Sequence, residues 1–189
     1  ENAPAPACDR HDARPLPVTV ALRVRLANGP AERAGALALR RAVFCGEQAV
    51  FADSDRDAID DEADFLVAVP LSAGAAAAPV LGTVRIHRDA PRRWWGSRLA
   101  VDRLWRGHGR LGAGLIRLAV ATANARGCDE FLAHVQAQNE PLFRRLGWIT
   151  LARESLHGRA HCLMRADLAA FPPHPDPATG ERLLARRAR

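Results

Sequence analysis

Apolar and polar positions show two periodicities along this chain, and these predict strands alternating with helices. Residues 80–87 alternate apolar with polar side chains, as a half-buried strand does, whereas Leu111, Leu115 and Leu118 recur at helical spacing. Strands interleaved with helices and hairpin turns imply an α/β or α+β fold around a mixed sheet. The predicted strands are 18–26, 64–69, 80–87, 95–102, 130–135, 148–156 and 161–167, and the predicted helices are 31–44, the segment between Gly109 and Gly127, and the segment between Asn139 and Gly147.

The length and composition fit one folded domain. With 189 residues, 48% of them hydrophobic, the chain can bury a core. We expect residues 1–17 to form a flexible lead, residues 18–168 the domain, and the proline- and arginine-rich residues 169–189 a tail that leaves the core. The alanine-rich segment 70–79 is expected to connect two strands as a hairpin.

A glycine-rich run at residues 106–114 stands between a predicted strand and a predicted helix. Its sequence is Arg-Gly-His-Gly-Arg-Leu-Gly-Ala-Gly. Such a turn at a helix start offers unshielded backbone N–H groups and the positive end of the helix dipole, which can hold a pyrophosphate. Glycine-rich turns also form for steric reasons alone. The run therefore indicates a nucleotide-bearing cofactor, and Arg106 and Arg110 either contact its phosphates or stay solvated.

The segments after this run carry a resemblance. A short strand at 131–135 is followed by Asn139, which can cap a short helix, and by Gly147, which can end it. This order of strand, glycine-rich loop, helix, strand and capped helix resembles the GCN5-related N-acetyltransferase superfamily over residues 18–168.

Two further segments point to one branch of that superfamily. Residues 39–48 are similar to its first-helix motif, and residues 64–68 are similar to the strand that follows it. Together with residues 135–139, they resemble the bacterial acetyltransferases of the nitrogen-starvation type.

The resemblance implies acetyl-CoA as co-substrate. In the superfamily a mostly antiparallel sheet has helices on both faces, the strands equivalent to 98–102 and 130–135 splay apart, and the pantetheine arm lies between them. A bulge in the first of these strands frees backbone groups for the arm and the thioester. The residues that this implies for acetyl-CoA binding are Leu99, Ala100, Val101, Arg106, Gly107, His108, Gly109, Arg110, Leu111, Gly112, Ala113, Asn139 and Phe143.

The loop departs from the superfamily pattern, which is Arg-x-x-Gly-x-Gly/Ala. Arg106 and Gly109 match it, but Leu111 stands at the last position and the next glycine is Gly112. Either one residue is inserted or the register shifts. We expect the phosphates to be held in both cases, because backbone donors remain abundant.

The catalytic acid of many superfamily members is a tyrosine, and this chain contains none. Phe143 stands where that tyrosine is expected. Acetyl transfer requires an unprotonated amine and a polarised thioester carbonyl. A thiolate is already a tolerable leaving group near neutral pH. The acid is therefore another residue, water or nothing.

His134 and Glu47 are the candidate catalytic residues. His134 can face the splayed cleft as a base, or it is a hydrogen-bonded histidine on the sheet surface. Glu47 follows the first helix, where relatives form the lip of the acceptor site; it deprotonates or binds an amine, or is a solvated glutamate. His157 and His161 on the last hairpin are further bases, and Gly158 between them disfavours a zinc site. We expect no metal.

The expected reaction is acetyl transfer from acetyl-CoA to a primary amine of a small molecule, by direct attack in a ternary complex. Cys45 and Cys162 have no paired base visible in the sequence, which disfavours an acyl-enzyme. The missing tyrosine suggests the alternative, a non-catalytic module that binds acyl-CoA as a sensor or partner.

Seven carboxylates gather between residues 53 and 64, and three tryptophans bracket the fourth strand. A calcium loop is disfavoured because Ala58 replaces the required glycine. The acidic segment is either a solvated surface or a rim that attracts a cationic amine. Trp94, Trp95 and Trp105 either pack in the core or flank the acceptor and the cofactor entrance.

The formal net charge is +6, and every basic residue except histidine is arginine. A basic surface suits nucleic acid, but no nucleic-acid motif accompanies it, so we expect neither a nucleic-acid nor a membrane partner. No apolar run approaches the roughly 18 to 20 residues that cross a membrane. Four widely spaced cysteines favour a reducing cytoplasm, and a homodimer stays open.

Overall fold

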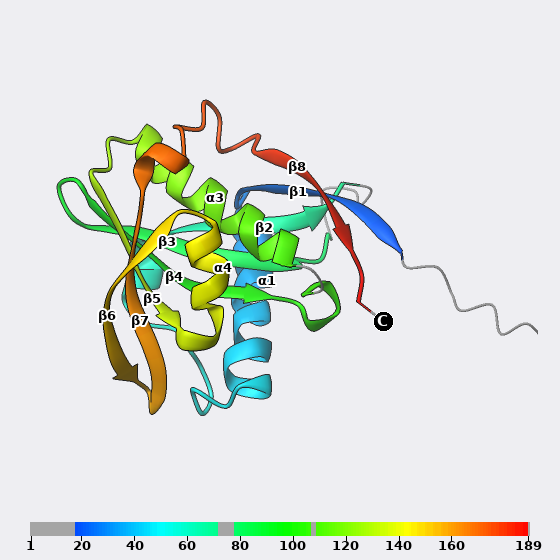
Figure 1. Cartoon of the computed structure of the whole chain (residues 1–189). Helices are drawn as coiled ribbons and strands as arrows, with labels where there is room; N and C mark the ends of the chain where they lie inside the picture. The colour runs from blue at the N-terminus through cyan, green and yellow to red at the C-terminus, as the bar shows by residue number, and fades with distance from the viewer. Residues whose placement is uncertain (1–17, 72–77, 107–108, 189) are drawn as a thin grey trace, which may run out of the picture.

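The computed structural model describes residues 18–71, 78–106 and 109–188. It contains one eight-stranded sheet with the strand order β6-β7-β5-β4-β3-β2-β1-β8 (Figure 1). The strands are β1 (Thr19–Leu26), β2 (Asp64–Pro70), β3 (Gly82–Ala90), β4 (Arg93–Val101), β5 (Glu130–Gln136), β6 (Trp148–Leu156), β7 (Arg159–Ala166) and β8 (Glu181–Arg186). The α-helices are α1 (Pro30–Arg41), α2 (Ile59–Glu62), α3 (Arg110–Ala125) and α4 (Glu140–Arg145). The predicted flexible lead, 1–17, lies outside the described residues.

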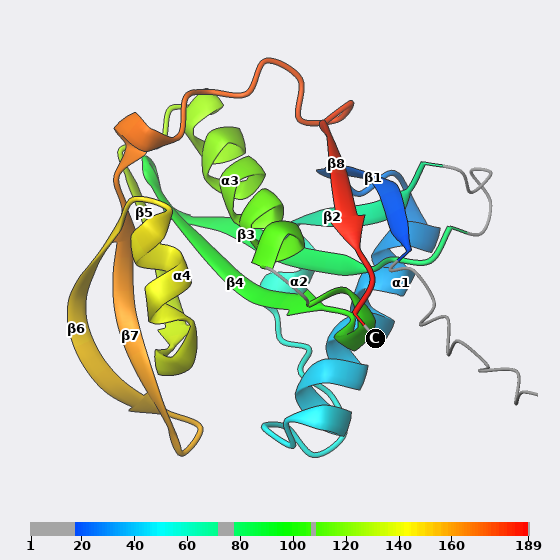
Figure 2. The ribbon, with the colours of Figure 1, turned by 45° about the vertical axis from the view of Figure 1, so that its right-hand side comes forward.

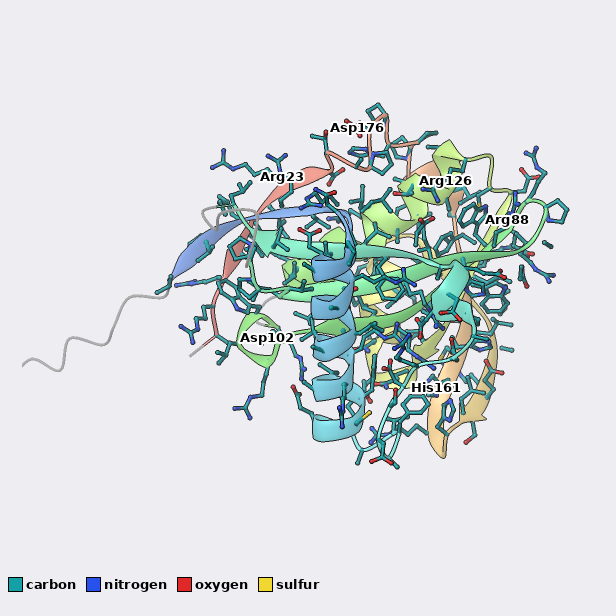
Figure 3. The ribbon with its side chains drawn as sticks, turned by 180° about the vertical axis from the view of Figure 1, so that it is seen from behind. Arg23, Arg88, Asp102, Arg126, His161 and Asp176 are labelled. Carbon is teal, nitrogen blue, oxygen red and sulfur yellow. The ribbon has the colours of Figure 1, made fainter. Side chains whose placement is uncertain are left out.

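The sheet is mixed, as predicted. Strands β4 and β5 pair in parallel, and the other neighbouring strands pair antiparallel. Helices α3 and α4 cover one face, and α1 covers the other (Figures 1 and 3). The predicted fold class is confirmed.

Helix α3 buries the stripe that its sequence predicts. Leu111, Leu115 and Leu118 are at most 1% exposed. Gly82 on β3 permits this close packing, because a Cβ there would lie 2.8 Å from Leu115 Cδ1. The helix therefore sits firmly on β3 and β4, and its N-terminus is fixed beside the end of β4.

Helix α1 continues into a π-helical turn, Ala42–Glu47. The helix predicted at 31–44 thus extends three residues further, to Glu47. Val43 and Phe44 are buried and pack with Ala100 of β4. This packing carries Glu47 and Gln48 to the end of the sheet where β4 and β5 diverge.

The C-terminal segment is part of the fold, contrary to the prediction that residues 169–189 leave the core. Strand β8 pairs antiparallel with β1 and extends the sheet by one strand. Phe171 and Ala185 are 3% and 2% exposed. Burial of these side chains and the backbone pairing with β1 outweigh the proline-rich composition of the preceding segment. Among the described residues, no helix is long and apolar enough to span a membrane.

Candidate active site

Strands β4 and β5 separate after only three residue pairs. Pairing runs from Arg93 and Glu130 to Trp95 and Leu132, and the strands then diverge (Figure 2). The expected splay is therefore present. A cleft opens between them, lined by Gly96 to Leu99 of β4 and by most of β5.

Strand β4 carries a bulge beside this cleft. Thr83 pairs with Ala100 but Arg85 pairs with Ser97, so β4 holds one extra residue at Arg98 and Leu99. Arg98 has a φ of 55°, in the left-handed region that non-glycine residues rarely adopt. The bulge releases backbone groups of Arg98 and Leu99 from the ladder, as the resemblance implies.

A largely buried network of three arginines and three aspartates, in which Asp57 reaches the surface, holds the bulge in place. Arg40 donates to Asp55 at 2.7 Å and to Asp60 at 2.6 Å, and all three are 1% exposed. Arg85 donates to Asp60 at 2.9 Å. Arg98 donates to the Asp55 carbonyl at 3.1 Å and to the carboxylate of Asp57 at 3.1 Å.

This network corrects the prediction for two residues of the acidic segment, whereas Asp53, Asp57, Asp61 and Glu62 are exposed as a solvated surface requires. Asp55 and Asp60 form neither a solvated surface nor an acidic rim, since both are buried against cations. Burial raises the pKa of Asp60, but hydrogen bonds from Arg40, from the Asp57 backbone and from Arg85 outweigh burial and hold that pKa well below its usual range. Because charge is balanced among the six side chains, a buried ionic cluster is tolerated here.

The N-terminus of α3 has backbone donors that the helix itself does not use. Gly109 precedes the helix with a φ of 67° and provides no side-chain cap. The N–H groups of Arg110, Leu111 and Gly112 therefore lack partners within the helix. A Cβ at Gly112 would meet nothing within 4 Å, so the backbone is open there to a phosphate. Leu111 instead points into the core, 1% exposed. Gly107 and His108 lie outside the described residues.

His134 lies in the cleft with two partners. Its Nδ1–H donates to the carboxylate of Glu154 on β6. Its ring stacks on Trp95, with centroids 5.1 Å apart and planes inclined by 15°. The Glu154 contact assigns the ring proton to Nδ1, which leaves Nε2 of the neutral ring as a proton acceptor.

Two other histidines line the same cleft. His161 Nδ1 lies 2.9 Å from the carbonyl oxygen of Arg159, an acceptor, so Nδ1 holds the proton and Nε2 accepts. His161 lies on the α1 face of the molecule (Figure 3). His157 packs against Phe51 with ring centroids 4.9 Å apart. The described residues contain no group of three or more histidine, cysteine or acidic side chains placed to hold a metal ion.

The segment after the π-helical turn covers the α1 side of the cleft. Gln136 Nε2 on β5 donates to Gln48 Oε1 at 2.9 Å, and Arg159 on β7 donates to the Gln48 carbonyl. Phe51 reaches the β6–β7 hairpin through His157. These contacts cover the part of the cleft that lies next to His134 from the α1 side.

Glu47 does not join His134. Its carboxylate accepts from Arg106 Nη1 at 2.7 Å, and it is absent from the residues that line the cleft. Arg106 also donates to the Val101 carbonyl at 2.8 Å. The structure thus places Glu47 beside the glycine-rich loop, at the predicted cofactor end.

Asn139 and Phe143 line the cleft from α4 and the turn before it. Asn139 occupies the N-cap position but makes no side-chain cap hydrogen bond, so the predicted capping role is wrong. Phe143 is 6% exposed and packs edge-on against Trp148, with centroids 5.0 Å apart. It fills the position expected for an acid with an apolar ring.

Cys162 and the tryptophans take structural places. Cys162 is fully buried; burial and the neighbouring Glu140 carboxylate raise the pKa of its thiol, which disfavours a thiolate nucleophile. Trp94 packs in the core on the α3 face, and Trp105 packs partly against that core. Trp95 alone of the three contacts a candidate catalytic residue.

The family model of the acetyltransferase (GNAT) family matches residues 37–148. The chain belongs to this family. GNAT members are acyltransferases, so the coarse activity is acyl transfer. The match includes the β4 bulge, the start of α3 and the diverging strands. No curated protein matches the chain.

Solved structures show the same GNAT fold. A Lactobacillus plantarum protein described as an N-acetyltransferase is 25% identical, with a TM-score of 0.68 over 78% of this chain and 98% of that one. Escherichia coli ElaA is 19% identical, with a TM-score of 0.63 over 77% and 98%. An acyl-CoA N-acyltransferase from Pseudomonas aeruginosa is 20% identical, with a TM-score of 0.62 over 77% and 98%.

Sequence reasoning missed Glu154, Gln48 and Gln136 as parts of this site. Glu154 lies on β6 and reaches His134 across β7. The sequence did contain one signal, the alternation of side chains between the two faces of the last hairpin. This alternation puts Glu154 directly opposite His161. The register that brings them to His134 depends on pairing between β5 and β7, which no local pattern fixes.

Proposed function

We propose that this chain transfers an acetyl group from acetyl-CoA to the primary amine of a small molecule, by direct attack in a ternary complex. One arrangement carries the proposal. The start of α3 offers helix N–H groups beside the end of β4, and the open cleft has the β4 bulge in its lining and the His134–Glu154 pair on its polar side.

Acetyl-CoA fits this arrangement as a substrate. The N-terminus of α3 would hold the pyrophosphate, since the backbone donors of its first turn and the helix dipole converge there. Arg110 is exposed at this helix start and adds positive charge. The pantetheine arm would follow β4 toward the bulge, where a backbone N–H of Arg98 or Leu99 would polarise the thioester oxygen.

His134 would act as the base. Its Nε2 takes a proton from the amine as the amine nitrogen forms a bond to the thioester carbon. The C–S bond then breaks, and CoA leaves as the thiolate with the bonding electron pair. A thiol titrates near pH 8.5, so the leaving group does not depend on an acid at the Phe143 position.

The contacts that cover the acceptor side support a small amine. Gln48, Phe51 and the β6–β7 hairpin close over this side through the contacts described above. Glu154 contacts His134, and Glu47 contacts Arg106. Because both carboxylates already have partners, the amine would bind to imidazole and amide groups next to His134.

Release of free thiol from acetyl-CoA, measured across a panel of amines, amino acids and short peptides, tests the proposal. We expect amine-dependent thiol release with at least one small primary amine, and an acetylated product by mass spectrometry. Intact CoA binding with no thiol release from any amine would support the non-catalytic module instead, for which the buried Phe143 is the favouring observation.

A further inference from the structure

The cleft has two chemically different sides. The α1 side carries His134, His161, Gln48 and Gln136. The α3 side is apolar and is lined by Val84, Ile116, Ala119, Phe131, Ala133 and Trp148, each at most 5% exposed. An amine suits the first side, whereas the second offers a surface for hydrocarbon.

The apolar side lies beyond the place proposed for the thioester. On β4 the cleft continues past the bulge to Gly96, roughly 7 Å beyond Arg98 at an extended rise. An acetyl group extends past its carbonyl carbon by one C–C bond of about 1.5 Å. The closed end is therefore deeper than acetyl needs.

Gly96 shapes this closed end. A Cβ at Gly96 would lie 2.9 Å from a ring carbon of Phe131. The absence of a side chain at this position lets the Phe131 ring lie against β4, and a larger residue would displace the ring. Ala119 and Ala133 are also small, so the lining leaves room between α3 and the diverging strands.

We propose that the apolar end of the cleft binds the alkyl part of an acyl-CoA several methylenes longer than acetyl. The inference rests on the proposed function, because it takes the thioester to lie at the β4 bulge. The reaction is unchanged: the amine nitrogen bonds to the acyl carbon, its proton goes to His134, and CoA leaves as the thiolate. What changes is the acyl donor, since longer chains gain contact with the apolar lining.

Titration calorimetry without amine tests this inference, using CoA and its acetyl, butyryl and hexanoyl thioesters. We expect binding to tighten by about fourfold for each buried methylene. Ala119→Leu should remove this gain and leave CoA affinity unchanged. Ala121→Leu is the matched control: Ala121 is 8% exposed on the same helix and does not line the cleft. Thermal unfolding confirms that each variant folds, and Ala133→Val supplies a second way to narrow the cavity.

The outcomes separate this inference from the proposed function. Affinity that is flat or falls from acetyl to hexanoyl in the wild-type protein, with acetyl-CoA bound and turned over, overturns the inference and leaves the function intact. The inference is also overturned if Ala119→Leu and Ala121→Leu lose the gain in affinity with acyl chain length to the same extent. Failure of CoA and every thioester to bind overturns both.

Discussion

His134 on β5 donates a hydrogen bond from Nδ1 to the carboxylate of Glu154 on β6, across the intervening strand β7. The carboxylate fixes the tautomer of the ring, and it would stabilise the imidazolium formed when Nε2 takes a proton. Trp95 stacks on the ring and limits its rotation. This pair joins two strands that are not neighbours in the sheet into one candidate base.

His134→Gln should preserve CoA binding and lower turnover by about 10²- to 10⁴-fold, the usual contribution of a positioned acid–base group. At saturating amine, the acidic limb of the kcat profile should disappear with the base. Glu154→Gln keeps an acceptor for Nδ1 of His134 but removes the negative charge, so it should lower turnover less than His134→Gln does. Steady-state rates over pH check both variants.

His161→Gln is the matched control for His134→Gln, because the His161 side chain lines the same cleft and its Nε2 is also free to accept a proton. If turnover falls more in His161→Gln than in His134→Gln, the base is His161 on the β6–β7 hairpin. Unchanged rates in both variants would point to a base acting through water.

Glu47→Gln should change cofactor affinity and leave the KM for amine unchanged, because Glu47 contacts Arg106. Removing the carboxylate frees Arg106 for phosphate, and an exposed pair of this kind is worth about 0.2–1 kcal/mol. We therefore expect CoA to bind up to about fivefold tighter. Arg106→Gln should weaken binding. A raised KM for amine in Glu47→Gln would instead restore this residue to the acceptor site.

CoA at a hundred times its dissociation constant should stabilise the fold by about 2.7 kcal/mol. Gly109→Asp should remove most of this shift, because it places a carboxylate against the phosphates. Gly109→Asn has the same size and tolerates the left-handed conformation at this position, so it controls for strain. Thermal unfolding with and without CoA distinguishes them, and an equal shift in both variants would argue against phosphate binding at α3.

Asp60→Asn should lower the free energy of unfolding by about 3–5 kcal/mol, because it leaves Arg40 and Arg85 with an uncompensated buried charge. Asp61→Asn, on the exposed neighbour, should change stability by less than about 0.5 kcal/mol. Urea denaturation at neutral pH measures both. Similarly small decreases in the free energy of unfolding for both variants would show that the network contributes little to stability.

Acid should unfold this protein through the same carboxylates. Hydrogen bonds from Thr150 and Arg153 lower the pKa of Glu140 to about 2, and arginines outweigh burial to lower those of Asp57 and Asp60. The unfolded chain binds these protons first, near pH 4. Stability is therefore full above that pH and falls as pH decreases. The slope of stability against pH should be shallower in Asp60→Asn, and an identical slope would contradict this assignment.

The sequence predicted the elements whose pattern is local and repeated. Helix α3 and strand β5 follow from their periodic apolar positions, and the glycine-rich start of α3 follows from composition. Strand β8 was missed because its six residues follow a proline-rich segment and depend on β1 for pairing. Its apolar residues at 183–185 were the available signal.

The site followed from the sequence only in part. The chain shows the charges of Asp55 and Asp60 but not their partners, because Arg85 and Arg98 come from β3 and β4. Glu47 was assigned from its place after α1, yet the π-helical turn directs it to Arg106. Such pairings depend on tertiary packing between distant segments.

Initial rates with both substrates varied test the central claim, direct transfer within one cleft, most directly. Once an amine is accepted, double-reciprocal plots against acetyl-CoA at several amine concentrations should intersect, with one acetylated amine formed for each thiol released. Parallel lines, together with an acetylated protein intermediate, would contradict direct attack.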